Sequence, residues 1–480
     1  MEAPSAVFRQ LHPLTFVHYV FLAIVGFAFA ALSSPSYGGD AQRYSLIFAT
    51  LYATVTGPYA IAKYIRFRYH VTSDELVIYY GVFKRVRRNI PFERIHTVSI
   101  ERNMLARILG TAAVRIETAG TGDAEGNLSY VGVREAERIR NLLRTAQAVD
   151  SPESPTSPSF FMPLRRVLLS SIYQFSLGIS ALLVGVFFQL ESFGIVDGRA
   201  LTTWLVEQNF FSGTIEEFWP LLIALLLLVT FVLGWTLGFI QNLIRFYNFR
   251  IELGAMKIRR RFGLITLHEG AIPYKRVQSF LIRSNPLMRL YNWHRLEMQT
   301  LGLQSGERGF QPGMPFAKWA EITALAPKIR PFSIPESYAP VSRLTIRRRT
   351  LRYSLLIVLS SVIISLLWWP LALWGLCLLP AGWGLASLQY LCHRWAYYDG
   401  NLLIRRRVFS QQFWIIPVER FQAFEITATF FQRRLGLCTL IVDTAGAGDL
   451  RYPRIIDLER EEANRLLAEL YDAFQAEATW

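Results

Sequence analysis

Three stretches of this chain repeat one another without a gap, and they decide its fold. They are residues 89–120, NIPFERIHTVSIERNMLARILGTAAVRIETAG, residues 271–302, AIPYKRVQSFLIRSNPLMRLYNWHRLEMQTLG, and residues 415–446, IIPVERFQAFEITATFFQRRLGLCTLIVDTAG. A repeat of this size indicates a supersecondary or domain unit that is copied within one chain. We therefore expect one structural module to occur three times.

Identical residues mark the repeat at an Ile-Pro pair, two arginines, a threonine and a glycine. Without the isoleucines, these signature residues are Pro91, Arg94, Arg107, Thr118, Gly120, Pro273, Arg276, Arg289, Thr300, Gly302, Pro417, Arg420, Arg433, Thr444 and Gly446. Arg94 and its counterparts follow a proline that fixes a turn. An arginine that bridges this turn to Glu93 or Glu419 is favoured over a contact between modules, although the second copy has Lys275 there. At the glycines, a β-turn is favoured over a phosphate-binding loop.

Composition favours a membrane protein. The chain has 480 residues, a hydrophobic fraction of 52% and a net charge of +15. This length suits about three domains, and a basic balance favours either nucleic acid or an anionic membrane face as partner. The arginines concentrate at the ends of apolar stretches and do not form one basic face. We therefore expect a phospholipid membrane, and no nucleic acid, as partner.

Six apolar stretches are long enough to cross a hydrocarbon layer, which takes ~20 residues. They are residues 14–32 and 44–62, residues 167–190 and 218–244, and two crossings within residues 353–392, which Pro370 divides. Each pair precedes one copy of the repeat. The sequence thus predicts six transmembrane helices in three hairpins.

Basic residues flank these stretches on one side. Arg165 and Arg166 precede the third stretch, Lys63 and Arg66 follow the second, and Arg245 follows the fourth. Because basic residues are enriched in cytoplasmic loops, we expect a multi-pass protein whose termini and three modules face the cytoplasm.

Within each copy of the repeat, apolar and polar residues alternate with a period of two, which is typical of strands. Residues 95–100, 113–118 and 439–444 show this alternation. Each copy ends in an amphipathic segment that fits a helix with one apolar face, such as residues 458–470 in the last copy. Short antiparallel strands followed by one helix predict a small β-barrel or sandwich that the helix caps.

The predicted membrane and polar parts alternate along the chain. Their boundaries are a hairpin at 1–62, a module at 63–150, a linker and hairpin at 151–244, a module at 245–330, a hairpin at 331–392 and a module at 393–480.

A membrane hairpin, a basic exit, an Ile-Pro-x-x-Arg turn, a Thr-x-Gly strand end and a terminal helix recur three times in this order. In this combination the chain resembles the bacterial pleckstrin-homology (PH) membrane proteins of the YdbS/YdbT type. The resemblance implies a PH-like fold of two near-orthogonal sheets capped by a helix. It also implies a place in the bacterial inner membrane, no catalysis, and a role as a scaffold or an oligomerisation unit.

Basic runs within the modules are the candidates for contact with anionic lipid. They are Lys84, Arg85, Arg87, Arg88, Arg259, Arg260, Arg261, Arg405, Arg406 and Arg407. A Lys or Arg near an anionic leaflet contributes about 1 kcal/mol, so such runs could hold a module against the bilayer. The alternative, with equal weight, is that these runs only set topology and solubility. The run lies earlier in the second and third copies than in the first, which argues against a shared headgroup pocket.

No group of residues in the sequence predicts catalysis. The histidines and cysteines are dispersed, so we expect no metal site, no cofactor and no enzymatic activity. We expect instead an integral membrane scaffold whose modules contact anionic lipid headgroups or a partner membrane protein. A smaller PH-like membrane protein and a second copy of this chain are both candidate partners. The alternative function is a component of a transporter or channel complex, which the near absence of charge inside the apolar stretches disfavours.

Overall fold

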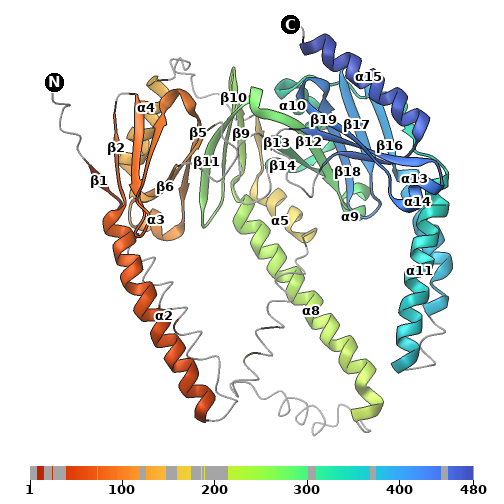
Figure 1. The fold of residues 1–480 in the computed structure, drawn as a ribbon, viewed down its shortest axis with the longest axis horizontal. Coiled ribbons are helices and arrows are strands. Elements are labelled where there is room, and N and C mark those ends of the chain that lie inside the picture. The colour runs from red at the N-terminus through yellow and green to blue at the C-terminus, as the bar shows by residue number, and fades with distance from the viewer. Residues whose placement is uncertain are drawn as a thin grey trace.

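The computed structural model places three strand-rich modules in a row, with the first module at the left and the third at the right in the view of Figure 1. It describes residues 8–13, 39–72, 74–118, 126–146, 159–174, 215–300, 310–367, 375–444 and 452–478, together with residues 15, 24, 27, 185 and 189. Three long helices leave the row on one side: α2 (Gly39–Arg66), α8 (Ile215–Phe246) and α11 (Leu344–Leu367). We call these the stalk helices.

The first module follows α2. Its elements are β1 (Arg9–Gln10), β2 (Arg68–Val71), β3 (Glu75–Tyr80), β4 (Val86–Pro91), β5 (Ile95–Arg102), α3 (Met104–Ile108), β6 (Thr111–Thr118), β7 (Gly126–Gly132) and α4 (Val133–Ala146). Strands β1 to β4 form one sheet, and β5 to β7 belong to a second.

The other two modules repeat this order. The second has β8 (Phe160–Phe161), α5 (Leu164–Ile172), α8, β9 (Arg250–Leu253), β10 (Lys257–Phe262), β11 (Leu267–Pro273), β12 (Val277–Ser284), α9 (Pro286–Leu290), β13 (Trp293–Thr300), β14 (Phe310–Lys318) and α10 (Trp319–Ile329). The third has β15 (Ala339–Pro340), α11, α13 (Leu379–Cys392), β16 (Arg394–Tyr398), β17 (Asn401–Arg406), β18 (Gln411–Pro417), β19 (Phe421–Thr427), α14 (Phe430–Arg434), β20 (Leu437–Thr444), β21 (Arg454–Glu459) and α15 (Arg460–Ala478).

The repeated residues impose the same local backbone in each module. The signature prolines have φ of −59°, −61° and −65°, and each begins a 3-10 turn between the fourth and fifth strands. The Asn285 side chain caps α9 by accepting a hydrogen bond from the Met288 amide, and Thr429 caps α14 in the same way. Each short helix is then followed by a residue in the left-handed region, Gly110, Asn292 or Gly436. Glycine and asparagine are the residues that adopt this region most readily.

Strand pairing joins the modules to one another. The second sheet of the first module and the first sheet of the second module form one seven-stranded sheet, in the order β7-β6-β5-β11-β10-β9-β8. The next junction has the same construction, in the order β14-β13-β12-β18-β17-β16-β15. The PH-like sandwiches that we predicted are therefore compatible with the structure, but neighbouring modules share sheets.

The core of the first module lies between its two sheets and α4, and includes Ile90, Ile116 and Ile139. The core of the second module extends into the third through Leu403, Phe413 and Ile415. Each fully buried aliphatic or aromatic side chain contributes roughly 1.5–3 kcal/mol. Burial across the junction therefore stabilises the row as well as each module.

The prediction of six transmembrane helices in three pairs is wrong. In the part of the chain that the structure describes, one helical segment, Leu228–Phe246 in α8, is long and apolar enough to cross a membrane. Helix α11 carries a run of arginines in its first turns, which shortens its apolar part. Helix α13 spans 14 residues, fewer than the ~20 that a crossing takes. The predicted crossings at residues 14–32 and 167–190 lie largely outside the described residues.

Candidate functional site

The second and third modules meet along strands β12 and β18, which we call the second seam. The antiparallel pairs are Phe280–Ile415, Leu281–Trp414, Ile282–Phe413, Arg283–Gln412 and Ser284–Gln411. All residues of β18 and nearly all of β12 are buried. Beside this pairing, the Gln299 amide donates to the Thr444 hydroxyl at 2.9 Å. The second seam is thus an interior of the protein, with apolar packing and a buried polar contact.

The first and second modules meet along β5 and β11, which we call the first seam. It has the pairs Leu267–Arg102, His268–Glu101 and Glu269–Ile100. Two polar contacts cross it: the ion pair Arg102–Glu269 at 3.4 Å, and His268 with Glu101 at 3.5 Å. Within each module, Arg115 pairs with Glu101 at 3.2 Å and Arg261 with Glu269 at 3.2 Å. Polar and partly exposed contacts therefore hold the first seam, in contrast to the second.

Glu101 is a carboxylate of the first seam whose pKa is shifted. Burial raises the pKa of its carboxyl, but a hydrogen bond from His268 and the positive charges of Arg115 and His268 outweigh burial, so its pKa lies below the ordinary value. Glu101 is therefore ionised at neutral pH, which keeps the alternating charges of the first seam paired.

A signature arginine clamps each seam from the short helix that follows it. Arg107 in α3 donates to the carbonyl of Leu264 at 2.8 Å, and Arg289 in α9 donates to the carbonyl of Val408 at 2.5 Å. Both acceptors lie in the turn that precedes the partner strand, nine residues before its signature proline. The sequence marked these arginines as repeated but gave no role for them. The signal was present, because the repeated column held a charged residue in an otherwise apolar short helix.

The other signature residues lie at corresponding positions in the three modules. Thr118, Thr300 and Thr444 pair opposite Ile95, Val277 and Phe421, each next to a register shift. Such a shift is typical of a β-bulge, which bends a strand at a conserved place. The signature glycines 120, 302 and 446 lie outside the described residues.

The arginines after the signature prolines occupy the turn, as the sequence predicted. Arg276 is buried, and Arg420 Nε lies 3.5 Å from Glu419. Glu419 also pairs with Arg330, at the end of α10 in the second module. The acid of the turn therefore contacts both its neighbouring arginine and the preceding module.

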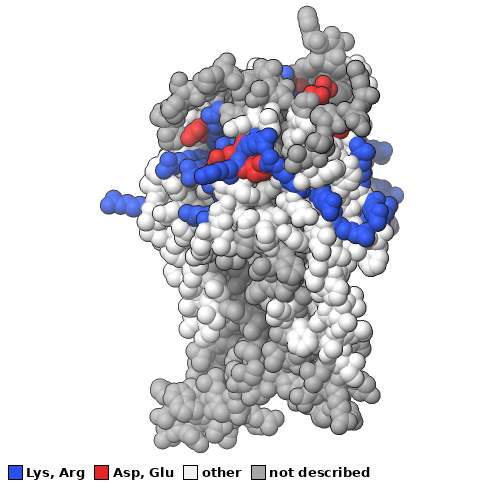
Figure 2. Space-filling model, turned by 90° about the vertical axis from the view of Figure 1, so that its left-hand side faces the viewer, with Lys and Arg blue, Asp and Glu red and all other residues white. Residues whose placement is uncertain are grey.

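The predicted basic runs occupy different environments. Arg260 is buried and donates to the carbonyl of Pro312 and to the Gln311 side chain. Arg406 is also buried and donates to Gln412, and burial, followed by the charges of Arg407, Arg454 and Arg283, lowers the pKa of its guanidinium to about 9. The fully or partly exposed members are Lys84, Arg85, Arg87, Arg88, Arg259, Arg261, Arg405 and Arg407. In Figure 2, Lys and Arg form a band across the first module, above an uncharged region.

Each module also exposes apolar side chains at the end that meets the stalk helices. We define the stalk-side tips as the β3–β4, β10–β11 and β17–β18 turns and the helices α3, α9 and α14. One position of the turn is apolar and exposed in all three modules: Phe83, Ile265 and Phe409 are 92%, 40% and 66% exposed. The short helices expose Met104, Ile108, Leu287, Leu290, Phe430 and Phe431. The Leu264 amide donates to the carbonyl of Ile244 in α8, which places the β10–β11 turn beside that stalk helix.

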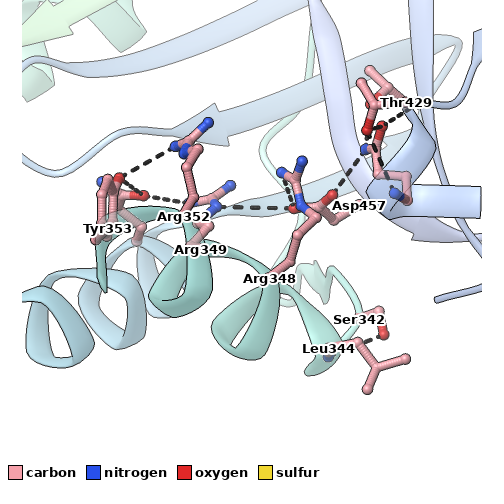
Figure 3. Close-up of polar contacts among 11 residues, drawn as sticks. Ser342, Leu344, Arg348, Arg349, Arg352, Tyr353, Thr429 and Asp457 are labelled. Atoms are coloured by element: carbon pink, nitrogen blue, oxygen red, sulfur yellow. Dashed lines mark hydrogen bonds and ion pairs between the residues drawn. The ribbon is translucent and has the colours of Figure 1, made fainter. Parts of the chain in front are cut away.

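A buried polar network fixes α11 to the third module (Figure 3). The carboxylate of Asp457 is fully buried and lies 2.8 Å from Arg348 and 3.9 Å from Arg349. The Gln432 amide donates to its other oxygen at 2.9 Å. Arg349 also donates to Gln389 in α13. The arginines at the start of α11 thus bind a carboxylate within the module.

One cavity of about 120 Å³ lies at the first seam. It is lined by Ser99 and Glu101 of the first module and by Arg260, His268 and Phe310 of the second. Among the residues that the structure describes, no group of three or more His, Cys, Asp and Glu could hold a metal ion. The described features are therefore strand pairing at the two seams and exposed apolar side chains at the stalk-side tips.

Comparison with known proteins agrees with this architecture. A family model described as Bacterial PH domain matches residues 17–147, 186–330 and 350–474, which confirms the resemblance stated from the sequence. The chain is 24% identical over 438 residues to the UPF0699 transmembrane protein YdbT of Bacillus subtilis (strain 168), and the match covers 85% of each chain. No solved structure matches.

Proposed function

This chain belongs to the bacterial PH domain family, and on that premise we propose that it is a non-enzymatic membrane scaffold. In this proposal its three modules rest on the cytoplasmic face of the bilayer and contact anionic lipid headgroups through their stalk-side tips. One observation carries the proposal: the stalk helices leave the row of modules on one side, and the exposed apolar tips lie on that same side.

The stalk helices support placement in a membrane. The segment Leu228–Phe246 of α8 is long enough to cross, and only 17% of its apolar window is buried. A core helix of a soluble domain would be mostly covered, since large exposed apolar surfaces are rare in water. The similar Bacillus protein bears the name of a transmembrane protein. Basic residues at the module end of these helices, Lys63, Arg66 and Arg245, favour a cytoplasmic position for the modules.

The chemistry of the tips suits the bilayer surface. Exposed Phe83 and Phe409 present rings that are stable at the boundary between headgroups and acyl chains. Arginines lie at the tips as well, since Arg289 donates to the carbonyl of Val408, next to Phe409, and Arg434 lies over the ring of Phe430. Each Lys or Arg near an anionic leaflet adds about 1 kcal/mol. Apolar insertion and attraction to headgroups therefore act on the same side of the row.

An environment-sensitive fluorophore can test this placement in lipid nanodiscs. We would first replace Cys377, Cys392 and Cys438 by Ala and then introduce Phe83→Cys, Ile265→Cys or Phe409→Cys for labelling. The matched control is Tyr471→Cys, because Tyr471 is exposed on α15 at the opposite side of the row. Brominated acyl chains should quench the three tip labels and leave the control label unchanged. Quenching should also weaken when anionic lipid is replaced by neutral lipid. Equal quenching at all four sites would refute the proposal.

A further inference from the structure

The first and the third module each carry a strand with an open edge. Among the described strands, β4 pairs with β3 alone, and β19 pairs with β20 alone. In the repeat, β11 and β18 correspond to β4, and β5 and β12 correspond to β19. These counterparts have no open edge, because β5 pairs with β11 and β12 pairs with β18. An edge strand presents unpaired amide and carbonyl groups that can pair with another chain.

Burial shows the same contrast. All residues of β18 are buried in the second seam, whereas the corresponding strand β4 exposes Arg87 and Asn89. Likewise β12 is almost wholly buried, whereas its counterpart β19 exposes Gln422, Ala423 and Glu425. In each seam the fifth strand of one module pairs with the fourth strand of the next. The first module therefore has a fourth strand, β4, that is free to form a seam, and the third module has a fifth strand, β19, that is free to do so.

Both seams within the chain use one register. The count starts at the arginine of the 3-10 turn, Arg94 or Arg276. The residue eight positions after this arginine lies opposite the residue six positions before the signature proline of the next module. This gives Arg102 opposite Leu267 in the first seam and Ser284 opposite Gln411 in the second. A third seam in this register would place Ala428 opposite Arg85, and three residues further along, Glu425 opposite Arg88.

At the position that would pair Glu425 with Arg88, the two facing side chains are complementary in size or charge in every seam. In the second seam the pair is Leu281 and Trp414, both buried. In the first seam it is Ser99 and Gly270, two small residues, and a Cβ added to Gly270 would lie 3.7 Å from the Ser99 Cβ. In the third it would be a carboxylate, Glu425, and a guanidinium, Arg88, on adjacent strands. Opposite charges that face each other across two strands stabilise the pairing.

The two groups that form the arginine contact at each seam, an arginine and a carbonyl, also occur at the two open strands. Arg433 in α14 is exposed and corresponds to Arg107 and Arg289. The carbonyl that corresponds to those of Leu264 and Val408 belongs to Val82. It accepts one hydrogen bond, from Arg66 at 3.2 Å, and a carbonyl oxygen can accept two.

We propose that copies of this chain assemble head to tail, with β19 of one copy added antiparallel to β4 of the next, Glu425 opposite Arg88, and Arg433 at the Val82 carbonyl. The stalk helices leave the row on one side (Figure 1), and repetition of the same seam keeps those of the next copy on that side. Such a heterologous contact closes into a ring or continues as an open row on one membrane.

Crosslinking of the full chain tests the register. Residues opposite each other on antiparallel strands have Cα atoms ~4.5–5.5 Å apart, which suits a disulfide. In a background of Cys377→Ala, Cys392→Ala and Cys438→Ala, the pair Arg88→Cys and Glu425→Cys should form covalent multimers on mild oxidation. A bond within one copy is excluded, since β4 and β19 belong to the first and third modules, which lie on either side of the second. The control, Arg88→Cys with Thr427→Cys, keeps the same face but shifts the register by two residues and should crosslink far less. Equal crosslinking in the two variants would overturn the proposal.

Charge exchange tests whether the contact forms without a covalent bond. Light scattering of the protein in detergent should give multiples of one chain mass for the native sequence. Arg88→Glu or Glu425→Arg should each lower the mass to that of one chain, and the two together should restore the multiples. Unchanged melting temperatures would show that the single variants fold. A native protein that stays a single chain at all concentrations, or a double variant that behaves like the single ones, would overturn the proposal.

Discussion

Arg107, Arg289 and Arg433 occupy one position of the repeat but have different surroundings. Arg107 and Arg289 donate to a carbonyl of the following module. Arg433 lies in the last module and is exposed. The same side chain can therefore stabilise a junction at two places and remain at the surface at the third.

This difference predicts unequal effects of one substitution. Arg289→Ala removes a hydrogen bond from a charged donor, which contributes about 1.5–3 kcal/mol. Arg433→Ala removes an exposed side chain and should change the free energy of unfolding by less than about 0.5 kcal/mol. Urea denaturation of dilute protein in detergent measures both. Equal losses in the two variants would show that Arg289 does not stabilise the second seam.

His393 predicts a dependence of stability on pH. Burial, followed by the charges of Arg349, Arg406 and Arg394, lowers the pKa of its imidazole from 6.5 to about 3. Between these two values the unfolded chain takes up a proton and the folded chain does not, so stability falls as the pH falls. The slope is about 1.4 kcal/mol per pH unit. His393→Asn should flatten the dependence between pH 6.5 and pH 4, as measured by urea denaturation. A native-like slope in the variant would exclude His393 as its source.

The basic runs show what the sequence revealed and what it concealed at this scale. Arg260 follows Ile258 by two positions in β10, and both are buried. A period of two places both side chains on one face of the strand, so the alternation already indicated that Arg260 points inward. The partners that stabilise it, Gln311 and Pro312, lie some 50 residues further along the chain. Sequence spacing does not reveal such partners.

At the scale of elements, helix α11 depends on a carboxylate of the module that it joins. Asp457 lies within β21, is fully buried and has a φ of 69°. Both of its oxygens have polar partners, from α11 on one side and from α14 on the other. The orientation of the helix pair α11 and α13 relative to the sheet is therefore set by buried charges.

Asp457→Asn should weaken the contact between α11 and the third module. The substitution leaves Arg348 and Arg349 as buried charges without a carboxylate, and breaking one partner of a buried pair costs about 3–5 kcal/mol. Thermal unfolding in detergent, followed by circular dichroism, should show a clear loss of stability. Asp472→Asn on the exposed face of α15 is the matched control and should unfold like the native protein. Indistinguishable melting curves for all three proteins would contradict this role of Asp457.

The elements of the modules were predictable because local signals agree. The repeat and the alternation of period two both indicated strands. In the structure the Asp399–Gly400 turn joins β16 and β17, and both turn residues have positive φ, as a tight hairpin turn requires. The six crossings were not correctly predicted, because hydropathy alone does not separate a spanning helix from one such as α11, whose arginines bind Asp457.

At the scale of the whole molecule, the two seams should differ in strength. The second has five ladder pairs that are mostly buried, and the first has three pairs with partly exposed ion pairs. Exposed ion pairs weaken as salt screens them. Hydrogen exchange should therefore be faster in β5 and β11 than in β12 and β18, and high salt should accelerate only the first pair. Equal protection of both seams at low and high salt would contradict this ranking.

The seams themselves could not be predicted from the sequence. Residues 100–102 pair with residues 267–269, and no local pattern specifies a register between strands so far apart. The repeat predicted three equal modules, but not that the fifth strand of each would pair with the fourth strand of the next.

The continuous sheets also have a mechanical consequence for the helices. Helix α2 leads into β2, α8 into β9 and α13 into β16, with at most three residues between. If one helix moved along its axis relative to the others, β5 would slide against β11 or β12 against β18, and ladder hydrogen bonds would break. The three helices should therefore shift or tilt together, as one rigid unit.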